Sequence, residues 1–527
     1  MTYYEIKDID LAARIGRLKT KSGVFETPYL FPVIDPIRQE VELDTVNKIG
    51  FNAIITNAYL YYRRSRGRAK DIHEYLRWNK PIMTDSGGYQ VLEYGDVEVT
   101  NKTIVSFQKE INVDIGVILD IPTGANMDYK QALEAVNETY KRAWEALPII
   151  QESSTLWVFP IQGAPYRDLV VKSSIMAWKL PYHIHALGSP TVLLERYEYS
   201  SLIELVALAR MHLPPHRPLH VFGVGHPMII PFLVALGADL FDSASYILYA
   251  RDNRYMIEGG TKRLEELEYF PCSCPVCSRY TPKDLLERNP RDRVKLLAMH
   301  NLFMLKREID TVKQAIKEGR LWELIEERSK SHPSLRDAFN VLKKYSEKLL
   351  AKYTPLSKGS VSAMLFYDYD TIYNPKVGLF IDNIKKWFPR RYNEIVLIPA
   401  VEKPYRAQDF VKKISNLENK DKMFYNLFLG LIPWNLTETY PVFQHEEPRY
   451  VDDERLCKYA ASIAAEYIIK NNYSTVEIIV VDDILWTKKF AEELRNKLYV
   501  KGVNVIEIVT TCTSGAVSHQ FQLRKPS

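Results

Sequence analysis

Long hydrophobic runs are missing from this 527-residue sequence, and their absence excludes an ordinary membrane-spanning helix. No uninterrupted apolar stretch reaches the roughly 20 residues that cross a bilayer. The polar start MTYYEIKDID also lacks the apolar core of a signal peptide. We therefore expect a cytoplasmic protein with no membrane contact.

Cysteine is scarce, and five copies are too few for a disulfide scaffold in a chain of this length. A large excess of one charge is missing too: the formal net charge of +5 permits a polyanionic partner without requiring one. There is no short repeat, no low-complexity segment and no P-loop. The length, with 46% hydrophobic and 26% charged residues, predicts a globular protein of two to four domains.

Eight short apolar runs alternate with amphipathic, helix-like stretches over the first part of the chain. The runs are PYLFPVI, NAIITNAY, KPIMTDSGG, IGVILDIP, LWVFPIQG, YHIHALGS, LHVFGVGH and ADLFDSAS. This alternation predicts an α/β fold with a parallel (β/α)8 TIM barrel; the alternative is an open, doubly wound sheet. A β-hairpin is expected just before it, over residues 12–32, with its turn at Ser22-Gly23.

Polar or glycine-rich tips end almost every one of these runs. Barrel enzymes gather their catalytic groups at the carboxyl ends of the strands, so the tips favour the barrel over the open sheet. The tip residues are Asn57, Asp85, Asp120, Gln162, Gly188, His226 and Asp242.

Three of the five cysteines, Cys272, Cys274 and Cys277, lie within six residues, and His300 follows after 22 intervening positions. Thiolates at this spacing with a distant imidazole suit tetrahedral Zn2+, and prolines stiffen the loop. The alternative is three unpaired core cysteines, which the polar and proline neighbours disfavour. Four protein ligands leave no open position, so we expect one structural zinc ion.

The rest of the chain divides into two regions by composition. Residues 1–353 form the expected catalytic domain, with a zinc-binding subdomain at about 270–305 and charged helices over 281–353. Residues 354–360 are typical of a linker. The remainder, 354–527, has its own buried-strand patterns and a plausible βαβ unit, which predicts a smaller α+β C-terminal region of one or two domains.

Asp85 in MTDSGGYQ and Asp242 in LFDSASY are the candidate catalytic residues. Each alone could be a helix N-cap. Together with Asp120 and Gln162 at the tips of one barrel, they would be costly to desolvate without a ligand or a shared proton. A carboxylate pair at a glycosidic carbon lets one group attack C1′ while the other manages protons.

Asp120 and Gln162 suit the edge of guanine, since a carboxylate accepts N1–H and N2–H and an amide serves the carbonyl side. Tyr89 could supply a stacking face, or be an ordinary core tyrosine.

At this point the sequence resembles the tRNA-guanine transglycosylases. The motifs DSGGYQ, VILDIP, IQG, HALGSP, FGVGHP, LFDSASY and CSCPVC…H occur in that family's order, over roughly residues 1–350. FDSASYILYARDNRYM and YFPCSCPVC are similar to the archaeal branch, which inserts 7-cyano-7-deazaguanine (preQ0) at position 15 of the D-arm of tRNA during archaeosine biosynthesis.

The resemblance implies a double displacement through a covalent ribosyl-aspartate. It makes Asp242 the nucleophile and Asp85 the general acid/base, although the Asp85 position has also been assigned as nucleophile in the archaeal branch. It also implies a homodimer. The base-binding positions that it implies, with the stacking candidate, are Ser86, Tyr89, Asp120, Gln162, Ala186 and Gly188.

Two basic and aromatic segments, YYRRSRGRAK (61–70) and KKWFPRR (385–391), suit contact with tRNA, although each could be a solvated face. Many archaeal relatives end in a PUA module that holds the tRNA acceptor end, and no complete one is recognisable here. We therefore expect that a separate PUA-domain protein supplies this contact or that tRNA affinity is lower.

Three other functions remain open at the sequence level. One is an archaeosine synthase-like or otherwise non-exchanging paralogue, against which the presence of both aspartates argues. A barrel glycoside hydrolase would share the carboxylate pair but would not need the cysteine loop. The last is a purely tRNA-binding scaffold.

Overall fold

The computed structural model describes residues 3–68, 70–88, 99–124, 127–188, 190–359, 363–412, 418–449 and 451–511. Contacts divide the chain into two compact units, Met1–Tyr353 and Thr354–Ser527, each with its own sheet and core. We refer to them as unit 1 and unit 2.

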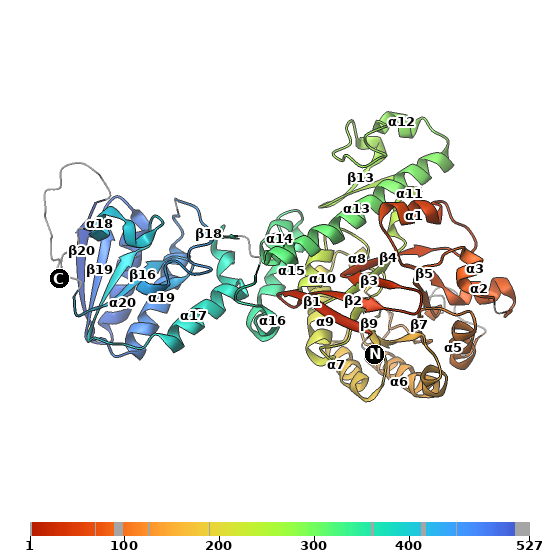
Figure 1. Cartoon of the computed structure of the whole chain (residues 1–527), viewed down its shortest axis with the longest axis horizontal. Coiled ribbons are helices and arrows are strands. Elements are labelled where there is room, and N and C mark those ends of the chain that lie inside the picture. Colours follow the sequence, from red (N-terminus) through yellow and green to blue (C-terminus); the bar gives the residue numbers. More distant parts are fainter. Residues whose placement is uncertain are drawn as a thin grey trace. The chain divides into compact units, whose positions relative to one another are not determined.

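Unit 1 is built around a closed barrel of eight parallel strands (Figure 1). Around the barrel the strands follow chain order, and the last pairs with the first, Asp242 lying opposite Phe31. They are β4 (Tyr29–Ile34), β5 (Ile54–Asn57), β6 (Ile82–Asp85), β7 (Ile115–Val117), β8 (Leu156–Ile161), β9 (Ile184–Leu187), β10 (Leu219–Val221) and β11 (Leu240–Ser243). Each of the eight predicted runs contains one of these strands, so the barrel is confirmed and the open sheet was the wrong alternative.

Helices cover the barrel between successive strands (Figure 1). Their apolar faces pack on the nearly continuous apolar strands, as burial on both sides of a parallel sheet requires. The helices are α1 (Leu43–Ile49), α2 (Ala58–Ser65), α3 (Ile72–Leu76), α5 (Asn101–Glu110), α6 (Tyr129–Gln151), α7 (Arg167–Met176), α8 (Thr191–Glu195), α9 (Tyr199–His212), α10 (Ile230–Ala235) and α11 (Ser245–Arg251).

A three-stranded antiparallel sheet precedes the barrel: β1 (Tyr4–Asp10), β2 (Ala13–Lys19) and β3 (Val24–Thr27). The predicted hairpin corresponds to β2 and β3, which pair across the turn at Ser22-Gly23. The predicted hairpin extends too far, because Pro28 has no N–H to continue the ladder and Tyr29 already begins the barrel. Strand β1 was not anticipated, since only two of its seven residues are buried and its alternation breaks at a bulge between Ile6 and Asp8.

After the barrel, unit 1 continues with a β-ribbon and a set of helices. The ribbon pairs β12 (Arg254–Ile257) with β13 (Gly260–Arg263). The helices are α12 (Pro282–Leu286), the 29-residue α13 (Pro290–Glu318), α14 (Leu321–Arg328), α15 (Pro333–Lys343) and α16 (Ala351–Tyr353). The helical character expected for residues 281–353 is thus observed.

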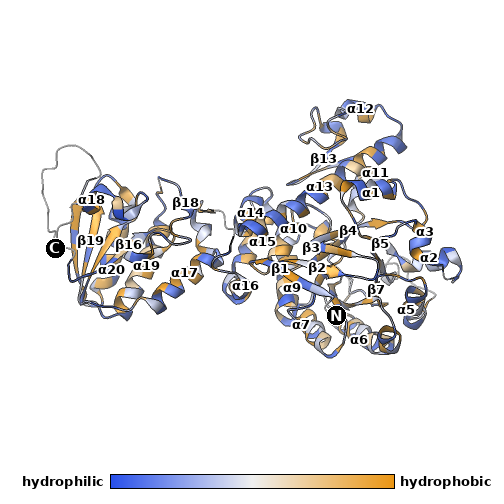
Figure 2. Ribbon diagram, viewed as in Figure 1, coloured by the Kyte–Doolittle hydropathy of each residue, from blue (hydrophilic) through white to orange (hydrophobic). Residues whose placement is uncertain are grey.

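Unit 2 contains a five-stranded sheet in the order β17-β16-β15-β19-β20, parallel except for β17. The sheet strands are apolar and appear mostly orange in Figure 2. The expected βαβ unit is present as β19, α20 and β20. The elements are β14 (Met364–Leu365), α17 (Pro375–Trp387), β15 (Glu394–Pro399), α18 (Asp409–Lys412), β16 (Asp421–Asn426), β17 (Gly430–Pro433), β18 (His445–Glu446), α19 (Glu454–Lys470), β19 (Thr475–Val481), α20 (Leu485–Tyr499) and β20 (Asn504–Thr510).

Across the described residues, no helix combines the length and apolar character needed to cross a membrane.

Candidate active site

Four of the predicted polar side chains meet at the carboxyl ends of the barrel strands. Asp85 is the last residue of β6 and Asp242 lies in β11, while Asp120 and Gln162 follow β7 and β8. The Asp85 carboxyl is close enough to Asp242 and Asp120 for both charges to shift its pKa. Gln162 Nε2 donates to Asp120 Oδ2 at 2.5 Å. The site is therefore a cluster of three carboxyl groups and one amide.

The Asp242 carboxylate is held through one of its oxygens. His220 Nε2 lies 2.8 Å from Oδ1, and the Gly223 N–H donates to the same oxygen at 3.1 Å. Within the described residues we find no hydrogen bond to Oδ2. Asp242 is not a helix cap either, since α11 begins after Ala244 without a side-chain cap.

His220 itself is completely buried in β10. Its ring stacks on Phe31 at 6.0 Å and lies 4.6 Å from the ring of Phe222. Its Nδ1 has no hydrogen-bond partner within the described part of the chain. Because a carboxylate oxygen can only accept, His220 donates this hydrogen bond to Asp242 from Nε2.

Asp85 has a very different environment from Asp242. Burial, and to a smaller extent the neighbouring Asp242 charge, together raise the pKa of its carboxyl to about 7. Hydrogen bonds from the Gly87 N–H, at 3.0 Å, and from Asn57 oppose this shift only in part. At neutral pH the Asp85 carboxyl can therefore both give and take a proton.

Asp120 and Gln162 are positioned by close approach of glycine backbone. Burial raises the pKa of Asp120 to about 6, against the hydrogen bond from Gln162 that lowers it. Gln162 Oε1 accepts from the Thr123 N–H at 3.1 Å, which fixes the amide with its NH2 toward Asp120. A Cβ on Gly88 would lie 2.5 Å from Asp120 Oδ1, and one on Gly188 would overlap the Gln162 amide. Both glycines are thus needed for the carboxyl–amide pair to fit.

Three of the remaining predicted base-binding positions, Ser86, Ala186 and Gly188, lie in or directly after barrel strands β6 and β9. Ser86 is buried directly after Asp85. Ala186 is buried in β9 opposite His220, and the Gly188 N–H donates to Ile161 O at 2.9 Å. A base meeting this turn would find the Gly188 N–H already engaged. Tyr89 lies outside the described residues.

Two of the predicted strand-end residues, His226 and Asn57, make contacts outside the carboxyl cluster. His226 Nδ1 accepts from the Met228 N–H, and burial lowers the pKa of His226 to about 4. Asn57 caps α2, its Oδ1 accepting the Leu60 N–H at 2.8 Å, and also contacts Asp85.

The raised pKa of Asp85 has a consequence for stability. Between the pKa of an unfolded aspartate, about 4, and its folded value of about 7, the folded protein retains a proton that the unfolded chain has lost. Stability should therefore fall as the pH rises through this range, with a slope of up to about 1.4 kcal/mol per pH unit. Asp85→Asn removes this slope, so we expect its stability relative to wild type to increase from pH 5 to pH 8 in chemical denaturation.

Asp114 provides a control, because its pKa is shifted in the opposite direction from that of Asp85. It is buried at the amino end of the barrel, where His73 and the N–H groups of Ile82 and Ser22 lower the pKa of its carboxyl despite burial. Asp114→Asn should cost more stability at pH 8 than at pH 4. An Asp85→Asn protein with the same pH dependence as wild type would contradict the raised pKa.

The first basic segment, residues 61–70, includes most of α2. This helix directly follows β5 and therefore starts at the carboxyl end of the barrel, where the candidate site lies. The four arginines of the segment, Arg63, Arg64, Arg66 and Arg68, are exposed, and no ion pair neutralises any of them in the described structure. Arg63 lies over the Tyr59 ring at 5.8 Å. This segment presents uncompensated positive charge at the end of the barrel that carries the candidate site.

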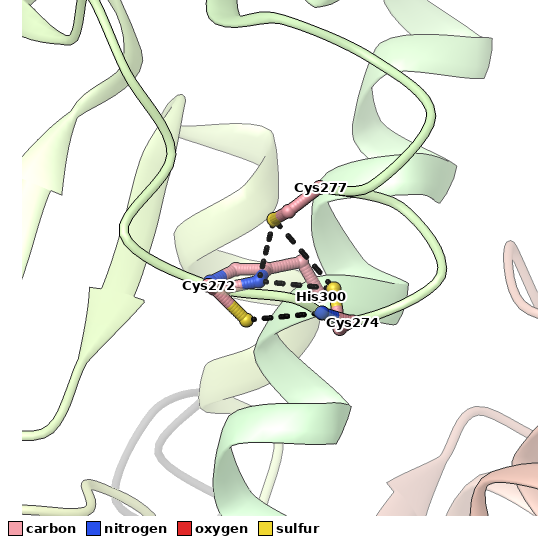
Figure 3. Close-up of side chains that lie close together, drawn as sticks. All are labelled: Cys272, Cys274, Cys277 and His300. Carbon is pink, nitrogen blue, oxygen red and sulfur yellow. Dashed lines mark hydrogen bonds between the residues drawn. The ribbon is translucent and has the colours of Figure 1, made fainter.

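A second candidate centre brings together Cys272, Cys274, Cys277 and His300, as predicted (Figure 3). All four ligand atoms lie within 4.8 Å of one another. His300 Nδ1 is 3.5 Å from Cys274 Sγ and 3.4 Å from Cys277 Sγ, and its Nε2 lies 2.9 Å from Met256 O. An N–H donated from Nε2 leaves the Nδ1 lone pair facing the sulfurs, the usual arrangement of a metal-binding histidine. The cluster could therefore hold a metal ion.

The Cys/His cluster is connected by side-chain contacts to α11, the helix that follows Asp242. Tyr255 stacks on the His300 ring at 3.7 Å, and its hydroxyl lies 3.3 Å from Cys277 Sγ. The next residue of α13, Asn301, donates to Tyr246 O of α11 and accepts from the Met256 N–H. The centre thus fixes α13 and the ribbon against α11.

Sequence reasoning missed His220. A histidine in the middle of an apolar run, LHVFGVGH, looks like a core residue. The available signal was strand alternation, in which every second side chain of β10 points to the same side of the sheet. That pattern indicates a contact between His220 and Asp242 only when the register of β10 with β11 is known.

Comparison with known proteins agrees with this geometry. A family model described as queuine tRNA-ribosyltransferase matches residues 9–334, which contain the barrel, the carboxyl cluster and the Cys/His centre. The chain is 44% identical to the "tRNA-guanine(15) transglycosylase" of Sulfolobus acidocaldarius, over 92% of this chain and 96% of that protein. Proteins of the same name are 44% identical in Saccharolobus solfataricus (91% and 97% covered) and 42% identical in Aeropyrum pernix (93% and 97% covered). The chain therefore belongs to the queuine tRNA-ribosyltransferase family of enzymes.

Proposed function

We propose that this enzyme exchanges a base in tRNA, replacing guanine at position 15 of the D-arm with preQ0 through a covalent ribosyl-aspartate, in archaeosine biosynthesis. The observation that carries the proposal is the difference between two neighbouring carboxyl groups, Asp242 held by two donors and Asp85 with a pKa of about 7. Neighbouring carboxyls pushed into different protonation states are typical of a nucleophile and an acid/base pair. The name shared by the relatives supports the choice of guanine-15 tRNA.

Asp242 is the nucleophile in this proposal, and Oδ2 is its attacking oxygen. His220 and Gly223 both donate to Oδ1, so Oδ2 is the oxygen without a described partner. In the first step Oδ2 forms a bond to C1′ and the bond from C1′ to guanine N9 breaks. Oδ1 becomes the ester carbonyl oxygen, still held by the same two donors.

Asp85 carries the protons. Its neutral form protonates the departing guanine, and the resulting carboxylate then takes a proton from the incoming deazaguanine. The nitrogen freed of that proton attacks C1′ and releases Asp242. Two inversions give net retention, and because one glycosidic bond replaces another, no ATP is consumed. With a pKa of about 7, Asp85 loses little driving force in either direction.

Asp120 and Gln162 recognise the base. The Asp120 carboxylate accepts N1–H and N2–H of guanine or its deaza analogue, and the Gln162 amide faces the carbonyl side. The hydrogen bond between them orients both groups before a base arrives. Ser86, Tyr89, Ala186 and Gly188 complete the proposed base-binding pocket.

The arginine-rich segment around α2 supports tRNA as the partner, because its four exposed arginines at the carboxyl end of the barrel form no ion pair with a described residue. A separate PUA-domain protein would add acceptor-end contacts, and a homodimer is the expected assembly. The cytoplasm is the expected location.

We further propose that the metal is a single zinc ion with a structural role. Three thiolates and one imidazole nitrogen are a donor set that tetrahedral Zn2+ favours, and all four positions come from the protein. When bound, the ion would crosslink the 272–277 loop to α13.

Incorporation of labelled base tests the function directly. Wild-type enzyme incubated with guanine-15 tRNA should incorporate labelled guanine and, more efficiently, preQ0, without ATP. Transcripts carrying adenine at position 15 are the matched control and should remain unlabelled. No incorporation of either base into the guanine-15 tRNA would refute exchange and favour an archaeosine synthase-like or tRNA-binding paralogue.

A further inference from the structure

The sheet of unit 2 has two edges of very different charge. Strands β15, β19 and β20 are parallel, and α17, α19 and α20 end immediately before them in the chain. The carboxyl ends of three helices and the starts of three strands therefore lie along one edge. We define the amino edge by Lys386, Trp387, Arg390, Arg391, Lys470 and Lys501.

Backbone contacts show that these residues form one continuous surface. An Arg390 guanidinium N–H donates to Asn472 O, two residues beyond Lys470. The Ser474 N–H donates to Asn393 O at 3.0 Å, and the Asn504 N–H donates to Ser474 O at 3.1 Å. The segments that begin β15, β19 and β20 thus lie side by side.

The positive charges of the amino edge are not neutralised. Its five cationic side chains are exposed, and none forms an ion pair with any described residue. The acids nearby offset only part of this charge: Glu466 pairs with Lys385 at 2.6 Å, Glu394 and Glu477 share Lys420, and the Asp421 carboxylate, whose Oδ2 accepts the N–H groups of Arg391 and Tyr392, balances one positive charge. The amino edge therefore carries a real excess of positive charge.

Apolar and aromatic side chains are exposed among these cations. Trp387 is 67% exposed and Tyr499, just before Lys501, is 76% exposed, with Val500 beside it. Single exposed apolar residues are common on proteins. Aromatic rings set among unpaired cations are the combination with which proteins bind single-stranded or unpaired nucleic acid.

Helix electrostatics explain only part of this pattern. Lysines in the last turn offset the negative end of the helix dipole, which is worth roughly 0.3–1 kcal/mol each and accounts for Lys386 and Lys470. Arg390, Arg391 and Lys501 lie outside the helices. The exposed rings have no such explanation.

At the opposite edge of the sheet, where the parallel strands end, several cations are paired with acids. Arg406 pairs with Glu438, Lys488 with Asp482 at 2.8 Å, and Lys489 with Asp452. This is the edge at which open α/β sheets ordinarily bind ligands. Here the paired charges make it a poor surface for a polyanion.

We propose that unit 2 binds RNA along the amino edge of its sheet, with the cations on phosphates and Trp387 and Tyr499 stacking on unpaired bases. That this RNA is the tRNA substrate rests on the proposed function. The surface would add affinity for tRNA to that of the barrel site.

The test compares two triple variants of the full chain, each losing three positive charges. Arg390→Ala/Arg391→Ala/Lys501→Ala should bind tRNA roughly tenfold or more weakly, and the slope of log K against log salt should shrink by about 2–3. Arg406→Ala/Lys488→Ala/Lys489→Ala at the opposite edge is the matched control and should bind as wild type does. Trp387→Ala alone should weaken binding with little change of slope.

Binding and exchange measured on the same variants separate this proposal from the proposed function. The amino-edge variant should keep kcat for exchange at saturating tRNA and raise only KM. If wild type binds tRNA through this edge but exchanges no base, the surface stands and the proposed function fails. If the amino-edge variant binds tRNA with wild-type affinity and slope, the surface proposal is overturned.

Discussion

Asp242→Asn should lower base exchange by about four orders of magnitude or more, with folding and tRNA binding retained. The asparagine carbonyl can still accept from His220 and the Gly223 N–H, so the side chain keeps its place. Its amide nitrogen, however, replaces the oxygen that we propose attacks C1′. Single-turnover incorporation of labelled guanine measures the rate, and a denaturing gel detects the covalent tRNA adduct, which this variant should lack.

Variants of two neighbouring residues test whether the role assigned to Asp242 is specific. His220→Phe keeps the nucleophile and removes one donor from Oδ1, which should lower kcat about 10- to 100-fold with little change of KM, as expected for a hydrogen bond to a charged group. Asp85→Asn should slow exchange through proton transfer but retain an attacking carboxylate. If Asp85→Asn abolishes the adduct while Asp242→Asn still forms it, the two aspartates have been assigned in the wrong order.

Cys274→Ser should release the metal and lower the free energy of unfolding of unit 1 by several kcal/mol. Its sulfur lies 3.6 Å from Cys277 Sγ and 3.5 Å from His300 Nδ1, at the centre of the cluster. A serine hydroxyl is a poor zinc ligand, and the binding free energy of a structural zinc is folding free energy. Elemental analysis of the purified protein gives the metal content, and chemical denaturation gives the stability.

Cys457→Ser is the control, because that cysteine is buried in α19 of unit 2 and is not among the four ligands. It should retain one metal ion per chain. Should Cys274→Ser abolish turnover while metal content and melting temperature remain those of wild type, the structural role of the metal would be wrong.

The sequence allowed the barrel and the candidate metal-binding cluster to be predicted because their signals are local. A strand buried on both faces must be an apolar run, and a polar residue at its end stands out, as Asp85 and Asp242 do. The cysteine spacing is local as well. His300 was predicted only because a fourth ligand was required, and the structure supplies the reason: a buried Nδ1 facing two sulfurs.

Features that depend on register or strand order could not be predicted. The contact of His220 with Asp242 joins two strands whose alignment no local pattern gives. The order of the unit 2 sheet, with β15 between β16 and β19, is likewise set by packing and not by sequence order. The different charges of its two edges follow from that order and from helix direction, so the KKWFPRR segment alone indicated only one part of the amino edge.

The pairing of β11 with β4 makes the first and last strands of the barrel neighbours, with Asp242 opposite Phe31 at the join. Asp242, the proposed nucleophile, therefore acquires its surroundings only after every intervening strand has been synthesised and the ring has closed. A nascent or truncated chain that ends before β11 can contain Asp85, Asp120 and Gln162 but lacks the proposed attacking group. Because so distant a pairing forms slowly, activity should appear late in synthesis and folding, once the barrel has closed.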